Sequence, residues 1–239
     1  MVVKFGIEIE LATKITPETN AVMSTLRNWR IDGDGSVRCA HSSSYGICTA
    51  CRARGMTQAE FKTAPDAPYT VDLNDITASV NMIARDVKKI YDSLENTSAN
   101  KSCGIHFHFS GIKKFAVFYS DEFLETLKAK YSAFCRNDSE RARFNTIYAE
   151  WVSFRRCPQN GERYRALNIR GAYEKHKTFE FRFFPSTKNI ETFKRYVRFA
   201  LEILKEVQET HYDGLSVTVP MARASETETE TNETIVKYV

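Results

Sequence analysis

Three segments of this 239-residue chain share one alternating pattern, which constrains the fold more than any other feature. They are FGIEIEL (5–11), GIHFHFS (104–110) and TFEFRFF (178–184). Successive side chains of a β-strand point to opposite faces. Each segment would therefore put its Ile, Leu or Phe side chains on one face and its ionisable side chains on the other. We expect three strands whose apolar face packs against helices.

The ionisable face carries acids, histidines and an arginine, whereas an ordinary solvent face favours Thr, Ser, Lys and Gln. The side chains are those of Glu8, Glu10, His106, His108, Glu180 and Arg182. Either this face simply meets water, or it holds metal ions, because carboxylate and imidazole groups ligate Mg²⁺ or Mn²⁺ and a cation relieves the repulsion between carboxylates. Three such strands favour a metal, and AEFKTAP (59–65) adds Glu60 to the set.

The other elements predict one α+β domain with helices on one side of a largely antiparallel sheet. Helices are expected at 17–29, 71–94, 121–134, 139–152 and 190–210. Strands are expected at 2–11, 103–111, 165–171 and 177–184. IDGDGS (31–36) is typical of a turn. We expect the domain to span 1–212 and the Thr- and Glu-rich segment 213–239 to be a flexible acidic tail.

Residues 39–55 form a polar insertion that contains a cluster of soft ligands. Cys39, His41, Cys48 and Cys51 follow the spacing C-x-H-x6-C-x2-C. Thiolate and imidazole groups this close together suit a tetrahedral Zn²⁺, and the loop has few apolar side chains with which to order itself. The alternatives are a polar loop with incidental thiols and a redox-active C-x-x-C pair. We expect a structural zinc ion outside the core of the domain.

The net charge of +4, from 34 basic and 30 acidic residues, is too mild to argue for a nucleic-acid partner. Arginines do gather between 136 and 170, and they form either a solvated helix face with a loop or a surface that faces an anion. They are Arg136, Arg141, Arg143, Arg155, Arg156, Arg163, Arg165 and Arg170.

The chain has no run of about 18 apolar residues, so no membrane span is expected. Its start, MVVKFGIEIE, lacks the basic and then apolar pattern of a signal peptide. We therefore expect a cytoplasmic protein. Cys103, Cys135 and Cys157 are scattered, as is typical of reduced thiols.

Six motifs in a fixed order give the chain a family resemblance over roughly residues 2 to 205. They are FGIEIE (5–10), DGS (34–36), EFKTAP (60–65), GIHFH (104–108), ALNIR (166–170) and TFEFRF (178–183). This order resembles that of the amidoligases, which are carboxylate–amine ligases of the glutamine synthetase and glutamate–cysteine ligase superfamily. GIHFHFS is also similar to the G-M-H-x-H-x-S strand of glutamine synthetase.

The resemblance implies a curved antiparallel sheet of the glutamine synthetase catalytic-domain type, with ATP and Mg²⁺ or Mn²⁺ on its concave face and helices on its convex face. The implied ligands of the catalytic metals are Glu8, Glu10, Glu60, His106 and Glu180. His108 would lie near the nucleotide phosphates, while Asp34 and Ser36 would line the nucleotide or acceptor side. Arg182 would contact the transferred phosphoryl group. Arg170, with Asn168 beside it, would bind phosphate or the substrate carboxylate.

The resemblance also implies an ATP-dependent ligase that joins a carboxylate to an amine through an acyl phosphate, forming an amide or isopeptide bond. Its substrates would be amino acids, peptides or proteins. Two alternatives stay open. One is a zinc-containing nucleic-acid or protein-binding module, although the acidic face would repel nucleic-acid phosphates in the absence of metal. The other is a metal-dependent hydrolase built on His106 and His108.

Overall fold

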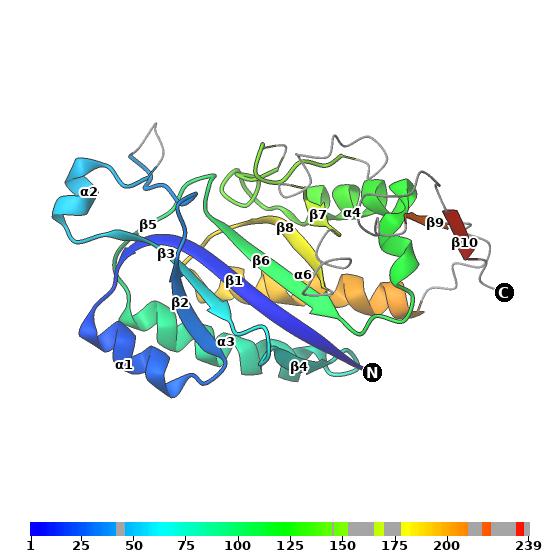
Figure 1. The fold of residues 1–239 in the computed structure, drawn as a ribbon, viewed down its shortest axis with the longest axis horizontal. Coiled ribbons are helices and arrows are strands. Elements are labelled where there is room, and N and C mark those ends of the chain that lie inside the picture. The colour runs from blue at the N-terminus through cyan, green and yellow to red at the C-terminus, as the bar shows by residue number, and fades with distance from the viewer. Residues whose placement is uncertain are drawn as a thin grey trace, which may run out of the picture.

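The long strand β1 (Val2–Lys14) runs through the middle of an eight-stranded antiparallel sheet (Figure 1). The computed structural model describes residues 1–41, 46–144, 146–152, 165–169, 178–209, 217–220 and 233–236. The other strands of the sheet are β2 (Trp29–Gly33), β3 (Thr57–Thr63), β4 (Tyr69–Asp72), β5 (Glu95–Ser98), β6 (Gly104–Ser110), β7 (Leu167–Asn168) and β8 (Phe179–Pro185). Their order is β2-β3-β1-β6-β8-β7, and both β4 and β5 also pair with β1.

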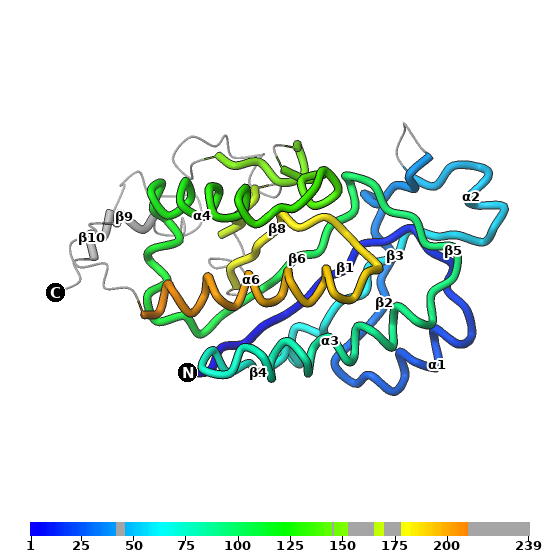
Figure 2. The backbone as a smooth tube through the Cα atoms, turned by 180° about the vertical axis from the view of Figure 1, so that it is seen from behind, coloured from blue at the N-terminus to red at the C-terminus, as the bar shows by residue number. Residues whose placement is uncertain are grey.

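Helices cover one face of this sheet, as Figure 2 shows from behind for α1, α3 and α6. The described helices are α1 (Pro17–Thr25), α2 (Thr49–Ala53), α3 (Ile76–Ser93), the 3-10 helix η1 (Phe115–Tyr119), α4 (Asp121–Phe134) and α6 (Ile190–Glu209). The α+β class and the antiparallel pairing are confirmed. The glutamine synthetase type and the convexity of the helical face stay predictions.

Aromatic side chains fill the core between this sheet face and the helices. The ring of Phe107 on β6 lies 5.2 Å from that of Phe5 and 5.0 Å from that of Phe184, with the Phe193 ring of α6 also in contact. The apolar face predicted from the alternation is therefore confirmed for β1 and β6, whereas Phe184, which alternation would place on the face of Arg182, also lies in the core. A register shift between β6 and β8 marks an irregularity in the ladder, and consecutive Phe183 and Phe184 are both fully buried there.

Several predicted elements differ from the structure. The helix predicted at 17–29 ends at Thr25, because Trp29 pairs with Thr63 in the sheet and donates a 2.7 Å hydrogen bond from Nε1 to Tyr69 Oη. The helix predicted at 71–94 is divided into β4 and α3. Val71 pairs with Val3 in the sheet, while Asp75 caps α3 by accepting a hydrogen bond from the Ala78 amide.

The helix predicted at 139–152 is wrong for the residues described there, which form turns and bends and, at Glu150, a bridge to Arg165. Buried polar contacts made by Glu140 and Arg143 hold this backbone instead of a helical repeat. Of the strand predicted at 165–171, Leu167–Asn168 pairs with β8 and Arg165 forms an isolated bridge with Glu150, while 170–171 lie outside the described residues. Within 213–239 the structure pairs β9 (Val217–Pro220) with β10 (Glu233–Val236), and the flexible tail stays a prediction.

Candidate active site

The antiparallel register gathers ionisable side chains from distant parts of the chain on the face opposite the helices. Glu8 pairs with His106, and Glu10 pairs with Glu60 across β1 and β3. His108 pairs with Glu180 across β6 and β8. Cross-strand partners have their Cβ atoms about 5 Å apart and project to the same face. The period-two pattern of single strands thus becomes a two-dimensional array of acids and imidazoles.

His106 lies at the centre of this array and is almost fully buried. Its Nδ1 atom is 3.2 Å from Glu8 Oε2 and 3.3 Å from Glu180 Oε1, and its Nε2 atom is 3.7 Å from Glu10 Oε1. Glu8, His106 and Glu180 each offer a ligand atom, and these three atoms lie within 4.8 Å of one another. This spacing could hold one metal ion.

A second group lies beside the first, formed by Glu10, Asp34 and Glu60. Their ligand atoms also fall within 4.8 Å of one another. Asp34 Oδ1 accepts 2.8 Å hydrogen bonds from the amide and the hydroxyl of Ser36, so the turn after β2 orients this carboxylate. The sequence grouped Asp34 with the nucleotide side, and the structure puts it next to two predicted metal ligands.

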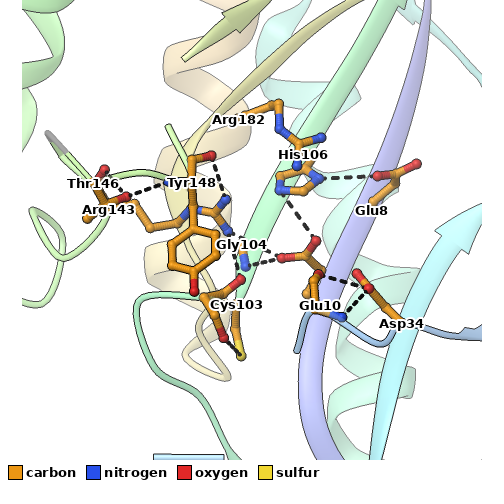
Figure 3. A network of polar contacts seen from close by, with 12 residues as sticks. Glu8, Glu10, Asp34, Cys103, Gly104, His106, Arg143, Thr146, Tyr148 and Arg182 are labelled. Carbon is orange, nitrogen blue, oxygen red and sulfur yellow. Dashed lines mark hydrogen bonds and ion pairs between the residues drawn. The ribbon is translucent and has the colours of Figure 1, made fainter. Parts of the chain in front are cut away.

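Glu10 is held by a network that the sequence did not predict (Figure 3). Its Oε2 atom accepts a 2.7 Å hydrogen bond from the Gly104 amide and a 3.2 Å bond from Nη1 of Arg143. Arg143 is 1% exposed and also donates from Nη2 to the Tyr148 carbonyl oxygen at 3.1 Å. The guanidinium group therefore neutralises one side of Glu10 and fixes its orientation.

Glu180 is buried among donors on the other side of His106. Nη1 of Arg182 donates to its Oε1 atom, and the Asn168 side-chain amide donates to its Oε2 atom at 2.8 Å. Burial alone would raise the pKa of Glu180, but the charges of Arg182 and His108 hold that pKa below its ordinary value. Glu180 is thus ionised at neutral pH and available as a ligand.

His108 and Glu8 form a second close pair, with Nε2 3.2 Å from Glu8 Oε1. Burial would lower the pKa of His108, but the carboxylates of Glu8 and Glu180 raise it to about 9. Burial would likewise raise the pKa of Glu8, yet His108 and His106 hold it well below its ordinary value. A positively charged His108 at neutral pH suits an anionic ligand such as a phosphate group.

Glu60 carries the charge that is least well compensated. Burial, together with the nearby carboxylates of Glu8 and Asp34, raises the pKa of Glu60 to about 7, although Lys62 opposes this shift. Lys62 Nζ contacts the Glu60 carboxylate and lies 2.9 Å from Asp32 Oδ2. Lys62 was not predicted as a site residue, although its position two residues after Glu60 places it on the same face.

The donor set fits divalent cations. Among the described residues, five carboxylates meet three permanent cations and the positively charged His108, so negative charge remains. The carboxylates are Glu8, Glu10, Asp34, Glu60 and Glu180, and the cations are Lys62, Arg143 and Arg182. The Nε2 atom of His106 is buried without a hydrogen bond, and its nearest carboxylate oxygen, Oε1 of Glu10, is 3.7 Å away. Buried polar atoms normally have a partner, so this atom suggests a ligand.

The four residues predicted to bind zinc also come together, beside α2. The ligand atoms of Cys39, His41, Cys48 and Cys51 lie within 4.8 Å of one another. The Cys48 amide donates to Cys39 Sγ at 3.4 Å, and Cys51 Sγ is 3.5 Å from His41 Nδ1. This Cys3His cluster is compatible with zinc.

The arginine-rich region is partly solvated and partly buried where the structure describes it. Arg136 and Arg141 are exposed, whereas Arg143 and Arg165 are buried, and Arg143 pairs with Glu10. Arg170 lies outside the described residues, as does the stretch 153–164. The sequence could not single out Arg143 among the arginines of this region, because its partner Glu10 lies 133 residues away along the chain.

Comparison with protein families finds a match for one part of the chain. Residues 112–204 match the family model described as "Putative amidoligase enzyme". The amidoligase resemblance is confirmed over these residues. The matched residues of this chain extend from just before η1 into α6 and include Asn168, Glu180 and Arg182. Glu8, Glu10, Glu60 and His106 lie outside it and join the site through the sheet register.

No curated protein and no solved structure matches the chain. Among the helices that the structure describes, none combines the length and the apolar character needed to cross a membrane. The amidoligase match therefore supports a ligase, and the residue-level picture rests on the geometry described above.

Proposed function

We propose that this protein is an ATP-dependent carboxylate–amine ligase that forms an amide or isopeptide bond through an acyl phosphate. The observation that carries the proposal is the pair of adjacent ligand groups on one sheet face, Glu8 with His106 and Glu180, and Glu10 with Asp34 and Glu60. The amidoligase match supports the reaction class. ATP, an acid and an amine are the implied partners.

Each ligand group would hold one Mg²⁺ or Mn²⁺ ion, because both groups offer hard oxygen ligands and one of them adds an imidazole. When bound, these ions would neutralise the charge of the nucleotide phosphates and of the transferred phosphoryl group. In the absence of a metal ion, Lys62, Arg143 and Arg182 reduce the repulsion between the carboxylates of the site.

The proposed reaction has two steps. A carboxylate oxygen of the acid substrate attacks the γ-phosphorus of ATP, the bond to the β-phosphate oxygen breaks, and ADP leaves. The amine nitrogen then attacks the acyl carbon, the bond to the phosphate oxygen breaks, and inorganic phosphate leaves while the amine proton passes to a base. Arg182 and the cationic His108 would attract the transferred phosphoryl group, and Arg170 would bind phosphate or the substrate carboxylate.

The test is a coupled assay for ADP with Mg²⁺ or Mn²⁺, in which amines and acids are screened as amino acids, peptides and proteins and each product is identified by mass. We expect metal-dependent ADP release and a product lighter by one water than the two substrates combined. Glu8→Gln and Glu180→Gln should abolish turnover, whereas Glu18→Gln on the exposed side of α1 should not.

The same assay separates the alternatives. Failure of ATP to bind in the presence of Mg²⁺ would overturn the ligase. Cleavage of phosphate esters or amides without nucleotide would favour a hydrolase built on His106 and His108. Salt-sensitive binding of DNA or RNA without ATP would instead favour the zinc-containing binding module.

A further inference from the structure

The Cys3His cluster lies next to the backbone that holds Glu10, a relationship that the sequence does not reveal. Val37, Cys39, Cys51 and Met56 form a small separate core together with Ala12 of β1 and Cys103. Ala12 is two residues after Glu10, and Cys103 directly precedes Gly104, whose amide binds Glu10. The cysteine loop is therefore packed against both strands that support one end of the acidic site.

Hydrogen bonds fasten this loop to the segment that leads into β6. Ser98 Oγ accepts from the Ala40 amide at 2.9 Å, and Ser102 Oγ accepts from the Arg38 amide at 3.1 Å. The Asn100 side-chain amide donates to the Cys39 carbonyl oxygen at 3.0 Å. Residues 38, 39 and 40 are thus bonded in turn to residues 102, 100 and 98. The position of 98–103 therefore depends on the conformation of 38–40.

The same segment also contacts the buried arginine. The Ser102 carbonyl oxygen is 3.5 Å from Nη1 of Arg143, the atom that donates to Glu10. Cys103 Sγ donates to the Arg38 carbonyl oxygen at 3.4 Å. A continuous set of contacts therefore runs from the ligand Cys39, through Arg38 and Ser102, to the bond between Arg143 and Glu10.

The ligand geometry favours a bound metal over a set of free thiols. At zinc–sulfur and zinc–nitrogen lengths, the edges of a tetrahedral Cys3His site measure about 3.5 to 3.8 Å. The 3.5 Å separation of Cys51 Sγ and His41 Nδ1 matches such an edge. The amide of Cys48 points at Cys39 Sγ, as a donor to a thiolate would. Three sulfurs and one imidazole select Zn²⁺ over Mg²⁺ or Ca²⁺.

We infer that Cys39, His41, Cys48 and Cys51 bind a structural Zn²⁺ ion that sets the position of Ser102 and Gly104 and thereby orients Glu10 and Arg143. Within its described residues the loop offers only a handful of buried apolar side chains, so the metal supplies most of the order that this backbone needs. The inference does not depend on the ligase reaction, because it concerns the folded chain without substrates.

The experiment uses the full chain purified under reducing conditions, with metal content read by plasma mass spectrometry. We expect equimolar zinc in the wild type and in Cys135→Ser, which removes a buried thiol remote from the cluster. Cys48→Ser and Cys51→Ser should lose the zinc and melt roughly 5 to 10 °C lower. Iron in place of zinc, or less than a tenth of an equivalent of either, would overturn the site.

Hydrogen exchange tests the link to the acidic site. Removal of zinc from the wild type with a high-affinity chelator should make the amides of 98–104 exchange roughly tenfold faster, while those of α3 stay unchanged. Addition of zinc should restore the original rates. Unchanged exchange at 98–104 after zinc loss would refute the positioning role. The chelated wild type also covers the case in which the cysteine variants do not fold, and no outcome depends on ligase activity.

Discussion

Gly104 and Arg143 occupy one small space, because a Cβ atom added to Gly104 would lie 1.8 Å from Nη1 of Arg143 and 2.7 Å from Nε2 of His106. No side chain fits there unless the guanidinium group moves. The glycine thus allows a buried arginine to lie directly over the strand that carries His106, and the same residue's amide binds Glu10. Gly104 therefore determines both the position of the Arg143 guanidinium group and the amide hydrogen bond, and these two contacts orient the carboxylate of Glu10.

We expect Gly104→Ala to displace Arg143 and destabilise the protein by about 2–4 kcal/mol, since the charges of a buried pair would be separated. The free energy of unfolding, measured by chemical denaturation, checks this. Gly33→Ala is the matched control, because an added Cβ there would meet nothing within 4 Å. Equal stability of the two variants would show that the site adapts without cost.

Arg143→Met should cost about 3–5 kcal/mol in the metal-free protein, because it leaves Glu10 buried without its counter-charge. The double variant Arg143→Met with Glu10→Gln should lose less than the sum of the two single variants. Equilibrium unfolding of the four proteins provides the cycle. Arg136→Met serves as the exposed control, and strict additivity would contradict a direct interaction between Arg143 and Glu10.

Mg²⁺ or Mn²⁺ should raise the melting temperature of the wild type, because a cation relieves the excess negative charge of the site. Glu8→Gln and Glu60→Gln each remove a ligand from a different group. Each should weaken metal binding and raise the dissociation constant roughly tenfold or more. Titration calorimetry measures the constants, with Glu18→Gln as control. If both variants bind metal as the wild type does, the two groups are not its site.

The metal-free protein should become less stable as the pH rises from about 4.5 to about 7 through the titration of Glu60. Folding raises the pKa of Glu60 from 4.5 to about 7. Between these values the unfolded chain binds fewer protons, and the free energy of unfolding therefore falls with increasing pH. Glu60→Gln lacks this titration.

Melting curves of the wild type and Glu60→Gln over this pH range check the contribution of Glu60. Their difference in stability should grow with pH in favour of the variant, and saturating Mg²⁺ should reverse the trend. Glu18→Gln should follow the wild type. Parallel curves for wild type and Glu60→Gln would show that Glu60 is ionised throughout.

Local pattern was enough to predict the strands and much of the site. Alternation at 5–11, 104–110 and 178–183 predicted which side chains share a face, because strand periodicity is a property of the backbone alone. It also placed Glu8, Glu10, His106 and Glu180 on the polar face, where the structure brings them together. Lys62 could have been found by the same rule.

The helix boundaries depended on long-range pairing. Trp29 had a helical context, but it pairs with Thr63 and bonds to Tyr69. Residues 139–152 had arginines and aromatics compatible with a helix, yet Arg143 contacts Glu10 from a turn. Tertiary contacts overrode local propensity in both places.

By itself, the sequence determined the two faces of the sheet, the α+β class, the acids and imidazoles of the site, and the four soft ligands of the cysteine loop. Only the tertiary structure decided which acids meet, that Asp34 joins Glu10 and Glu60, and that Arg143 neutralises Glu10. The reason is physical. Alternation is fixed by backbone geometry within a strand, whereas the register between strands and the approach of a distant turn depend on how the whole core packs.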